Sequence, residues 1–238
     1  MEKVTLLDLF QKLDYNWKND LEKISYICKY TKTRENPNLT KFVMPYGSEQ
    51  TFLIKAVLDS VGCKKYFEIG TGRGTSAYAA SLSPTVKDII TLDKIPFSKE
   101  RSMAINYKET TLSMKDLNAL IDVDTKHKIK FLHSSRKLFL AISNFSTFDV
   151  VFIDGNHDHR LIIYLDFLIS WMLIKKNGVI IFDDYEFNRF KVKEVVDTLK
   201  KLFKSYNFFL THTRGFLFEK SNIDDKNGMV LMSRKKFL

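Results

Sequence analysis

The chain has 238 residues, of which 45% are hydrophobic, enough for one α/β domain with a sizeable core. Its net charge of +10 comes mainly from lysine, because only eight of the 38 basic residues are arginine. Proteins that read nucleic-acid bases favour the bidentate fork of arginine. The composition therefore argues against nucleic acid as the main partner and favours a solvated, lysine-rich surface.

Membrane and secretory features are absent from the sequence pattern. No stretch reaches the roughly 18 uncharged apolar residues typical of a membrane span, because Asp166 interrupts the longest apolar run. The first residues do not resemble a signal peptide. Neither Cys28 nor Cys63 shows a metal-binding or redox spacing. These features predict a cytoplasmic protein without membrane association.

The N-terminal segment, residues 1–45, is predicted to form a helical cap, since apolar residues recur at helical spacing from Thr5 to about Thr33. A break at 36–38 ends this pattern. Residues 46–238 are predicted to form the main domain, which opens with a helix over 51–61 capped by Ser48.

Strands and helices alternate after this helix. Strands are expected over 65–69, 88–92, 129–133, 148–153, 178–182, 208–213 and 215–220, the last two as a hairpin at the sheet edge. Helices are expected over 76–83, 97–121, 137–143, 159–174 and 190–204. The repeated βα units predict a Rossmann-like, doubly wound, mostly parallel seven-stranded sheet with helices on both faces. Such sheets bind ligands outside the carboxyl ends of their strands.

A cluster of glycines follows the first expected strand, in the stretch Glu68-Ile69-Gly70-Thr71-Gly72-Arg73-Gly74-Thr75-Ser76. Glycine permits positive φ and lets a ligand approach the bare backbone. The dinucleotide fingerprint G-x-G-x-x-G would require a glycine at position 75, which is threonine. The acid at position 68 suits a cationic ligand and would repel a pyrophosphate. A glycine turn that holds no ligand is the alternative.

An acid followed by G-x-G-x-G is the motif of class I S-adenosylmethionine (SAM) methyltransferases, which the chain resembles from about Tyr46 onward. Asp93 closes the second expected strand, where an acid accepts hydrogen bonds from ribose hydroxyls or, alternatively, caps a turn. Ser76 begins a helix and can bind the methionine carboxylate. The residues predicted to bind SAM are Tyr46, Gly47, Glu68, Gly70, Thr71, Gly72, Gly74, Thr75, Ser76, Asp93, Ser134, Ser135 and Asp154, of which Tyr46, Gly47, Ser134 and Ser135 are implied by the resemblance.

Three carboxylates follow the fourth and fifth expected strands: Asp154 in F-I-D-G, and Asp183 and Asp184 in F-D-D. The carboxyl ends of parallel strands share one edge, and clustered acids repel one another unless a cation or a proton lies among them. Oxygen ligands suit Mg²⁺, Ca²⁺ or Mn²⁺. The pattern therefore predicts a divalent-cation site, with capping of the following helix as the alternative for the acid pair.

The patterns F-I-D-G-x-H and N-G-V-I-I-F-D-D resemble metal-dependent O-methyltransferases related to catechol O-methyltransferase, including bacterial enzymes that act on antibiotic sugars. The resemblance implies that Asp154, Asp183 and Asp184 hold the cation and that Asp154 and His157 are catalytic. His157 stands where the catechol enzymes have a lysine base, and neutral histidine is a competent base near pH 7. A loop histidine bonded to the backbone is the alternative.

The sequence thus predicts a SAM-dependent methyltransferase that O-methylates a small hydroxylated molecule, a sugar or a phenol, with the help of a divalent cation. The N-terminal helices either cover the pocket or form a homodimer interface. Two rivals remain open. One is an RNA- or protein-modifying methyltransferase, favoured by charge but lacking the Asn/Asp-Pro-Pro-aromatic signature of amine methylases. The other is a non-catalytic or hydroxylase-like relative of the same fold.

Overall fold

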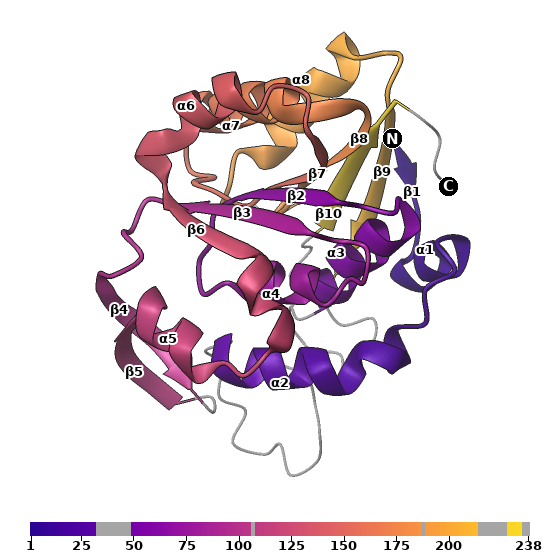
Figure 1. Cartoon of the computed structure of the whole chain (residues 1–238). Coiled ribbons are helices and arrows are strands. Elements are labelled where there is room, and N and C mark those ends of the chain that lie inside the picture. The colour runs from indigo at the N-terminus through magenta and orange to yellow at the C-terminus, as the bar shows by residue number, and fades with distance from the viewer. Residues whose placement is uncertain (32–48, 106–107, 187–188, 214–227, 235–238) are drawn as a thin grey trace.

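The computed structural model describes residues 1–31, 49–105, 108–186, 189–213 and 228–234 (Figure 1). The strands of its main sheet are β1 (Glu2–Lys3), β2 (Lys65–Ile69), β3 (Asp88–Asp93), β6 (Ile129–His133), β7 (Phe148–Ile153), β8 (Ile174–Phe182), β9 (Asn207–His212) and β10 (Gly228–Ser233). They run in the order β1-β9-β10-β8-β7-β2-β3-β6. Only β10 is antiparallel to its neighbours. The sheet is therefore mostly parallel, as predicted.

Helices cover both faces of this sheet (Figure 1). On one face lie α6 (Lys137–Ser143), α7 (Arg160–Leu173) and α8 (Val192–Leu202), and on the other α3 (Glu49–Ser60) and α4 (Thr75–Ser81). Because both faces are covered, the central strands are runs of buried residues, as in Phe148–Ile153, rather than alternating ones. The doubly wound architecture is thus confirmed.

The end of the sheet differs from the prediction. The sheet has eight strands rather than seven, because Glu2 and Lys3 pair in parallel with Phe209 and Leu210 of β9. The strand expected over 215–220 lies outside the described residues. The strand that pairs with β9 is instead β10, and it lies between β8 and β9 rather than at the edge.

The helix predicted over 97–121 is wrong for most of its length. Residues 100–113 form a separate antiparallel hairpin of β4 (Glu100–Ile105) and β5 (Lys108–Ser113), and only α5 (Met114–Leu120) is helical. The side chains of Ser113 and Asp116 form a capping box that starts α5. Thr110 and Thr111 are β-branched and favour the strand β5, which precedes α5.

The N-terminal segment forms α1 (Leu6–Lys12), a 3₁₀ turn η1 (Trp17–Asp20) and α2 (Leu21–Thr31). Its buried residues belong to the same apolar core as α3 and β2. Lys55 of α3 also forms an ion pair with Asp20, at 3.0 Å, and both side chains are largely buried. The segment is therefore packed directly onto the sheet domain; the division at residue 45 stays an interpretation.

Two further 3₁₀ turns, η2 (Asp124–Lys128) and η3 (Ser134–Arg136), flank β6. None of the described helices combines the length and the apolar character that crossing a membrane requires.

Candidate active site

The strand order reverses direction between β2 and β7, which are neighbours in the sheet. In the sequence, 78 residues lie between the last residue of β2 and the first residue of β7. From β2 the chain proceeds to β3 and β6 on one side, and from β7 to β8 on the other. The N–H of Asp154, just after β7, donates to the carbonyl of Ile69 at 2.8 Å. Such a switch point is where open α/β sheets bind ligands.

The predicted glycine turn lies at this switch point. Gly70, Gly72 and Gly74 all have positive φ, at 103°, 53° and 77°. A Cβ at Gly70 would collide with the backbone carbonyl of Asp154, whereas one at Gly72 would meet open space. Glycine is therefore required at Gly70 for packing, and the backbone at Gly72 is left bare for a ligand.

Glu68 is fully buried behind this turn. Its carboxylate accepts hydrogen bonds from the hydroxyl of Tyr66 at 2.9 Å and from that of Thr91 at 2.7 Å. Burial raises the pKa of Glu68 to about 7, and hydrogen bonds from Ser76, Thr91 and Tyr66 partly oppose this increase. Glu68 and Ser76 thus support the turn from within the protein.

Two threonines complete the turn. Thr71 is buried and its hydroxyl lies 2.6 Å from that of Thr91. Thr75 is the first residue of α4, directly after Gly74, which occupies the N-cap position in left-handed conformation. The turn therefore leads into the N-terminus of α4, as the sequence predicts.

Asp93 ends β3 and is already engaged by three donors. Its Oδ2 accepts from the N–H of Gly72 at 3.0 Å and from Nη1 of Arg101 at 2.9 Å. Its Oδ1 accepts from the N–H of Ile95 at 2.9 Å. Each carboxylate oxygen has two acceptor positions, and among the described residues only one donor reaches Oδ1, which leaves its second position for a ligand.

Arg101 contacts the candidate site through Asp93 but was not predicted from the sequence. It belongs to β4, in the hairpin that was expected to be helical. Its Nε and Nη2 are buried and have no hydrogen-bond partner among the residues that the structure describes. The strand-forming Thr110 and the helix cap at Ser113 were the available indications of a hairpin.

Ser134 and Ser135 lie in η3, which follows β6 beside Asp93. The register pairs His133 with Asp93 across the two strands. Nδ1 of His133 lies 2.8 Å from the hydroxyl of Ser135, and its Nε2 donates to the carbonyl of Lys94 at 3.1 Å. The structure thus places both serines at the same edge of the sheet as the glycine turn.

On the other side of the switch point, Asp154, His157 and Asp184 come together. Each offers one ligand atom, and these atoms all lie within 4.8 Å of one another. Nδ1 of His157 lies 3.1 Å from Oδ2 of Asp184 and is the donor, because an ionised carboxylate only accepts. Nε2 of His157 is buried without a hydrogen-bond partner in the described part of the chain.

Asp183 and Asp184 are held differently although they are adjacent. Asp183 is buried and directly follows β8, and its N–H donates to the carbonyl of Ile153 at 3.1 Å. Asp184 has a φ of 57°, which is uncommon for a residue other than glycine. The group of possible ligand atoms found among the described residues contains Asp184 and His157, but not Asp183.

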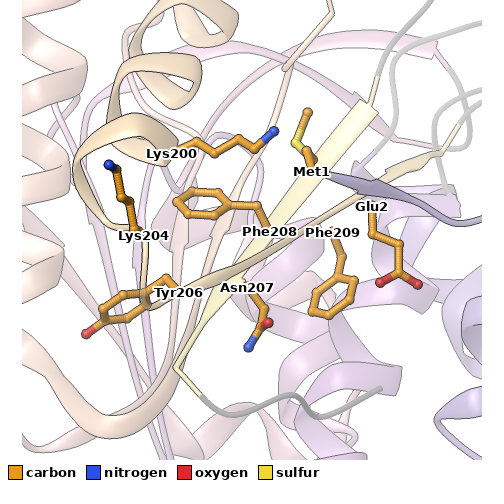
Figure 2. A pocket seen from close by; sticks show the side chains of 8 residues that line it. All are labelled: Met1, Glu2, Lys200, Lys204, Tyr206, Asn207, Phe208 and Phe209. Atoms are coloured by element: carbon orange, nitrogen blue, oxygen red, sulfur yellow. The ribbon is translucent and has the colours of Figure 1, made fainter.

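Two predicted cofactor residues, Tyr46 and Gly47, lie outside the described residues, as does Ser48. A cavity of 390 Å³ lies beside β1 and β9, at the other end of the sheet from the switch point. Its lining includes Lys200, Lys204 and Tyr206 (Figure 2). None of the predicted site residues lines it. This cavity therefore adds nothing to the site at the strand ends.

Comparisons with known proteins agree on the fold. The O-methyltransferase TomG from Streptomyces achromogenes, solved in complex with SAM, superposes with a TM-score of 0.56 at 14% identity, covering 90% of this chain and 88% of that one. A putative caffeoyl-CoA O-methyltransferase from Staphylococcus aureus gives 0.53 at 19% identity, covering 96% and 97%. An O-methyltransferase from Bacillus cereus in complex with SAH gives 0.53 at 12% identity, covering 94% and 91%. At such low identity these likenesses establish the architecture alone.

Sequence comparison identifies the family. A curated relative, "Uncharacterized protein R132" of Acanthamoeba polyphaga mimivirus, is 27% identical over 122 residues, which are 51% of each chain, so the chain spans about half the length of this relative. The family model described as "Methyltransferase domain" matches residues 67–185, half of the chain. The chain therefore belongs to this methyltransferase family, as its resemblance to class I SAM-dependent methyltransferases predicts.

Proposed function

We propose that the protein O-methylates a small hydroxylated acceptor, a sugar or a phenol, with SAM as donor and a divalent cation as helper. The observation that carries this proposal is the gathering of Asp154, His157 and Asp184 within 4.8 Å, beside the glycine turn. The Asp154 N–H is bonded directly to Ile69, the residue before that turn. Donor and acceptor sites would thus share one edge of the sheet.

The residues at the carboxyl ends of β2, β3 and β6 fit SAM, which supplies an electrophilic methyl group when bound. The bare backbone at Gly72 and the open acceptor position on Asp93 suit a ribose that donates a hydroxyl hydrogen. Ser134 and Ser135 would contact the adenine. Gly70, Thr71, Gly74 and Thr75 would form the turn on which the cofactor lies. Glu68, if ionised, adds a buried negative charge that favours the cationic methionine end. Tyr46 and Gly47 stay predictions for that same end.

The cluster at β7 and β8 fits a divalent cation. Two carboxylates within ligand distance of each other repel unless a positive charge lies between them. Asp154 and Asp184, with Asp183 alongside, would hold Mg²⁺ or Mn²⁺, which suits oxygen ligands. When bound, the cation would lower the pKa of an acceptor hydroxyl.

His157 is assigned to proton removal. Asp184 holds Nδ1, so in neutral histidine the lone pair is on Nε2, the atom that lacks a hydrogen-bond partner in the described residues. Asp184 would also stabilise the imidazolium that forms when Nε2 accepts a proton. If His157 were instead a cation ligand, its replacement would weaken cation binding as well as transfer.

Calorimetry and a transfer assay test the proposal together. Titration with SAM and then NAD, each with and without Mg²⁺, should show binding of SAM alone. Formation of S-adenosylhomocysteine should then require a phenol or sugar and should fall on chelation of the cation. Tight NAD binding would contradict the donor assignment, and methylation of RNA without that of small hydroxyl compounds would favour the RNA-modifying rival.

Variants separate the roles of the cluster. Asp183→Ala should abolish cation-stimulated transfer and leave SAM affinity unchanged, with Asp158→Asn, an exposed acid nearby, as the control. His157→Gln should remove transfer and keep cation affinity. Full activity of Asp183→Ala would rule out its role in holding the cation, and a loss of cation affinity in His157→Gln would make that histidine a ligand.

A further inference from the structure

An apolar surface on two neighbouring helices contains none of the residues assigned to catalysis. It consists of Leu138, Phe139, Ile142 and Phe145, in and just after α6, and of Leu161, Leu165 and Leu168 in α7. Each of these seven residues is between 49% and 69% exposed. We call this set the α6–α7 face.

The two helices that carry the α6–α7 face are held together within the folded chain. The two helices lie side by side on one face of the sheet (Figure 1). Lys137 at the start of α6 forms an ion pair of 2.6 Å with Asp166 of α7, whose side chain is only 3% exposed. Leu161, Leu165 and Leu168 follow the i, i+4, i+7 spacing that forms one stripe on a helix. A partner would therefore find the surface already formed.

The exposed area is unusually large for a monomer. At their exposures, the seven residues present on the order of 900 Å² when a fully exposed leucine or phenylalanine is taken as roughly 200 Å². The largest apolar patch of a typical monomer is about 300–600 Å². Stable protein–protein interfaces bury about 800 Å² on each partner. The α6–α7 face alone is thus large enough for one partner's share of a stable dimer.

The charge pattern selects the kind of partner. The chain carries a net charge of +10, yet it has no lysine or arginine from Leu138 to His159 or from Leu161 to Ile174. The basic residues at the helix starts are engaged, since Lys137 pairs with Asp166 and Arg160 pairs with Glu194. Lipid-surface helices and nucleic-acid sites depend on basic residues around or within the contact. This face instead suits an equally uncharged apolar surface.

We propose that the occupant is a second copy of this chain, joined through the α6–α7 face in a two-fold dimer. An isologous interface needs one self-complementary patch, and four helices packed from two copies meet that need. Contact at this face also keeps the lysine-rich remainder of both copies apart. The dimer does not depend on the proposed chemistry, because no residue of the face belongs to the site at the strand ends.

Light scattering after size-exclusion chromatography, over a range of protein concentrations, tests this proposal. The wild-type chain should elute at about twice its mass of 27.9 kDa. Leu165→Lys and Ile142→Lys should raise the dimer dissociation constant at least tenfold, because each buries an ammonium group in an apolar contact. Leu120→Lys is the matched control: Leu120 is 49% exposed, as Leu165 is, but lies in α5 away from this face. It should stay dimeric.

Other results would overturn the proposal. A monomeric wild type at every concentration would do so, as would a dimer that survives both Leu165→Lys and Ile142→Lys or is lost equally in Leu120→Lys. Cosedimentation of a monomeric wild type with phosphatidylcholine vesicles, lost in Leu165→Lys, would show that lipid is the occupant instead. Circular dichroism and thermal unfolding of each variant confirm that the fold is kept.

Discussion

The candidate site has two sides, at the carboxyl ends of β2, β3 and β6 and at those of β7 and β8. The carboxylates on these two sides are held in different ways. On the side of β2, β3 and β6 the carboxylates are bonded: Asp93 receives three hydrogen bonds and Glu68 is bonded to Tyr66 and Thr91. Two buried nitrogens of Arg101 on this side have no hydrogen-bond partner among the described residues. On the side of β7 and β8, two carboxylates and a histidine crowd within 4.8 Å, and one histidine nitrogen is buried without a hydrogen bond in the described residues.

This difference teaches which side supports the fold and which side is left for chemistry. A network whose members are satisfied rigidifies the structure around it. Carboxylates crowded together cost stability through their mutual repulsion, and such costs are found where function requires them. We therefore expect substitutions on the first side to change stability and cofactor affinity, and those on the second side to change turnover.

The largest effect is expected on the free energy of unfolding, at Gly70, where the two sides of the site are in contact. Gly70→Ala should lower the free energy of unfolding by about 4 kcal/mol or more, because φ is 103° and the new Cβ would collide with the carbonyl of Asp154. Gly62→Ala is the control, since Gly62 also has positive φ but a Cβ there meets open space. That variant should lose about 1–2 kcal/mol. Urea unfolding measures both, and equal losses would contradict the collision.

Asp184→Asn should have the next largest effect, and on turnover alone. An amide neither draws in a cation nor stabilises a charged His157, so kcat should fall about 10²- to 10⁴-fold. SAM affinity should change less than about twofold, since the described hydrogen bond of Asp184 goes to His157, on the side assigned to the cation. Steady-state kinetics and calorimetry separate the two quantities. A variant that turns over normally would show that the second side is structural.

Glu68→Gln should alter how stability depends on pH. The pKa of Glu68 rises from 4.5 to about 7 in the folded protein, so between these values the folded state holds a proton that the unfolded chain has released. Wild-type stability should therefore fall as pH rises through this window, by about 3 kcal/mol from this residue. Glutamine cannot ionise, so the variant should lack this component.

Urea unfolding at pH 5 and pH 8 checks this expectation. The difference between the wild type and Glu68→Gln should grow in favour of the variant at the higher pH, whereas a Glu22→Gln variant, altered at an exposed acid, should track the wild type. A constant difference between wild type and Glu68→Gln would mean that Glu68 does not titrate in this range.

The smallest effect is expected for Arg101→Met. Arg101 occupies an acceptor position on Asp93 that a ribose hydroxyl could use. Its removal should tighten SAM binding about three- to tenfold, the contribution of one hydrogen bond to a charged acceptor. Calorimetry of this variant and of Arg160→Met, a change on α7, measures the effect. Weaker SAM binding in Arg101→Met would instead make Arg101 a cofactor ligand.

Local sequence rules were sufficient for much of this structure. The apolar runs and the βα alternation predict the doubly wound sheet because central parallel strands are buried on both faces. The three glycines predict the turn because positive φ is a local requirement, here met at Gly70, Gly72 and Gly74. The strand-end positions of Asp93, Asp154 and Asp184 follow from the same alternation.

Local rules failed where the outcome depended on neighbours. The segment over 100–113 has helix-compatible composition, but it folds as a hairpin beside the sheet, and only that placement brings Arg101 to Asp93. The strand β10 was missed because its partners, β8 and β9, precede it at a distance along the chain. A local pattern can indicate a strand, but it does not say beside which other strands that strand lies.

The sequence by itself therefore determined the sheet and which acids lie at the carboxyl ends of its strands, because both depend on periodicity. It also determined the glycine turn, which depends on the backbone freedom of glycine. Only the tertiary structure decided how those groups are shared: Asp93 with Arg101, and His157 with Asp184 rather than Asp183. The physical reason is that hydrogen bonds depend on distance and direction in space. Those are set only in the folded chain, by the left-handed backbone at Asp184 and by the hairpin that brings Arg101 to the end of β3.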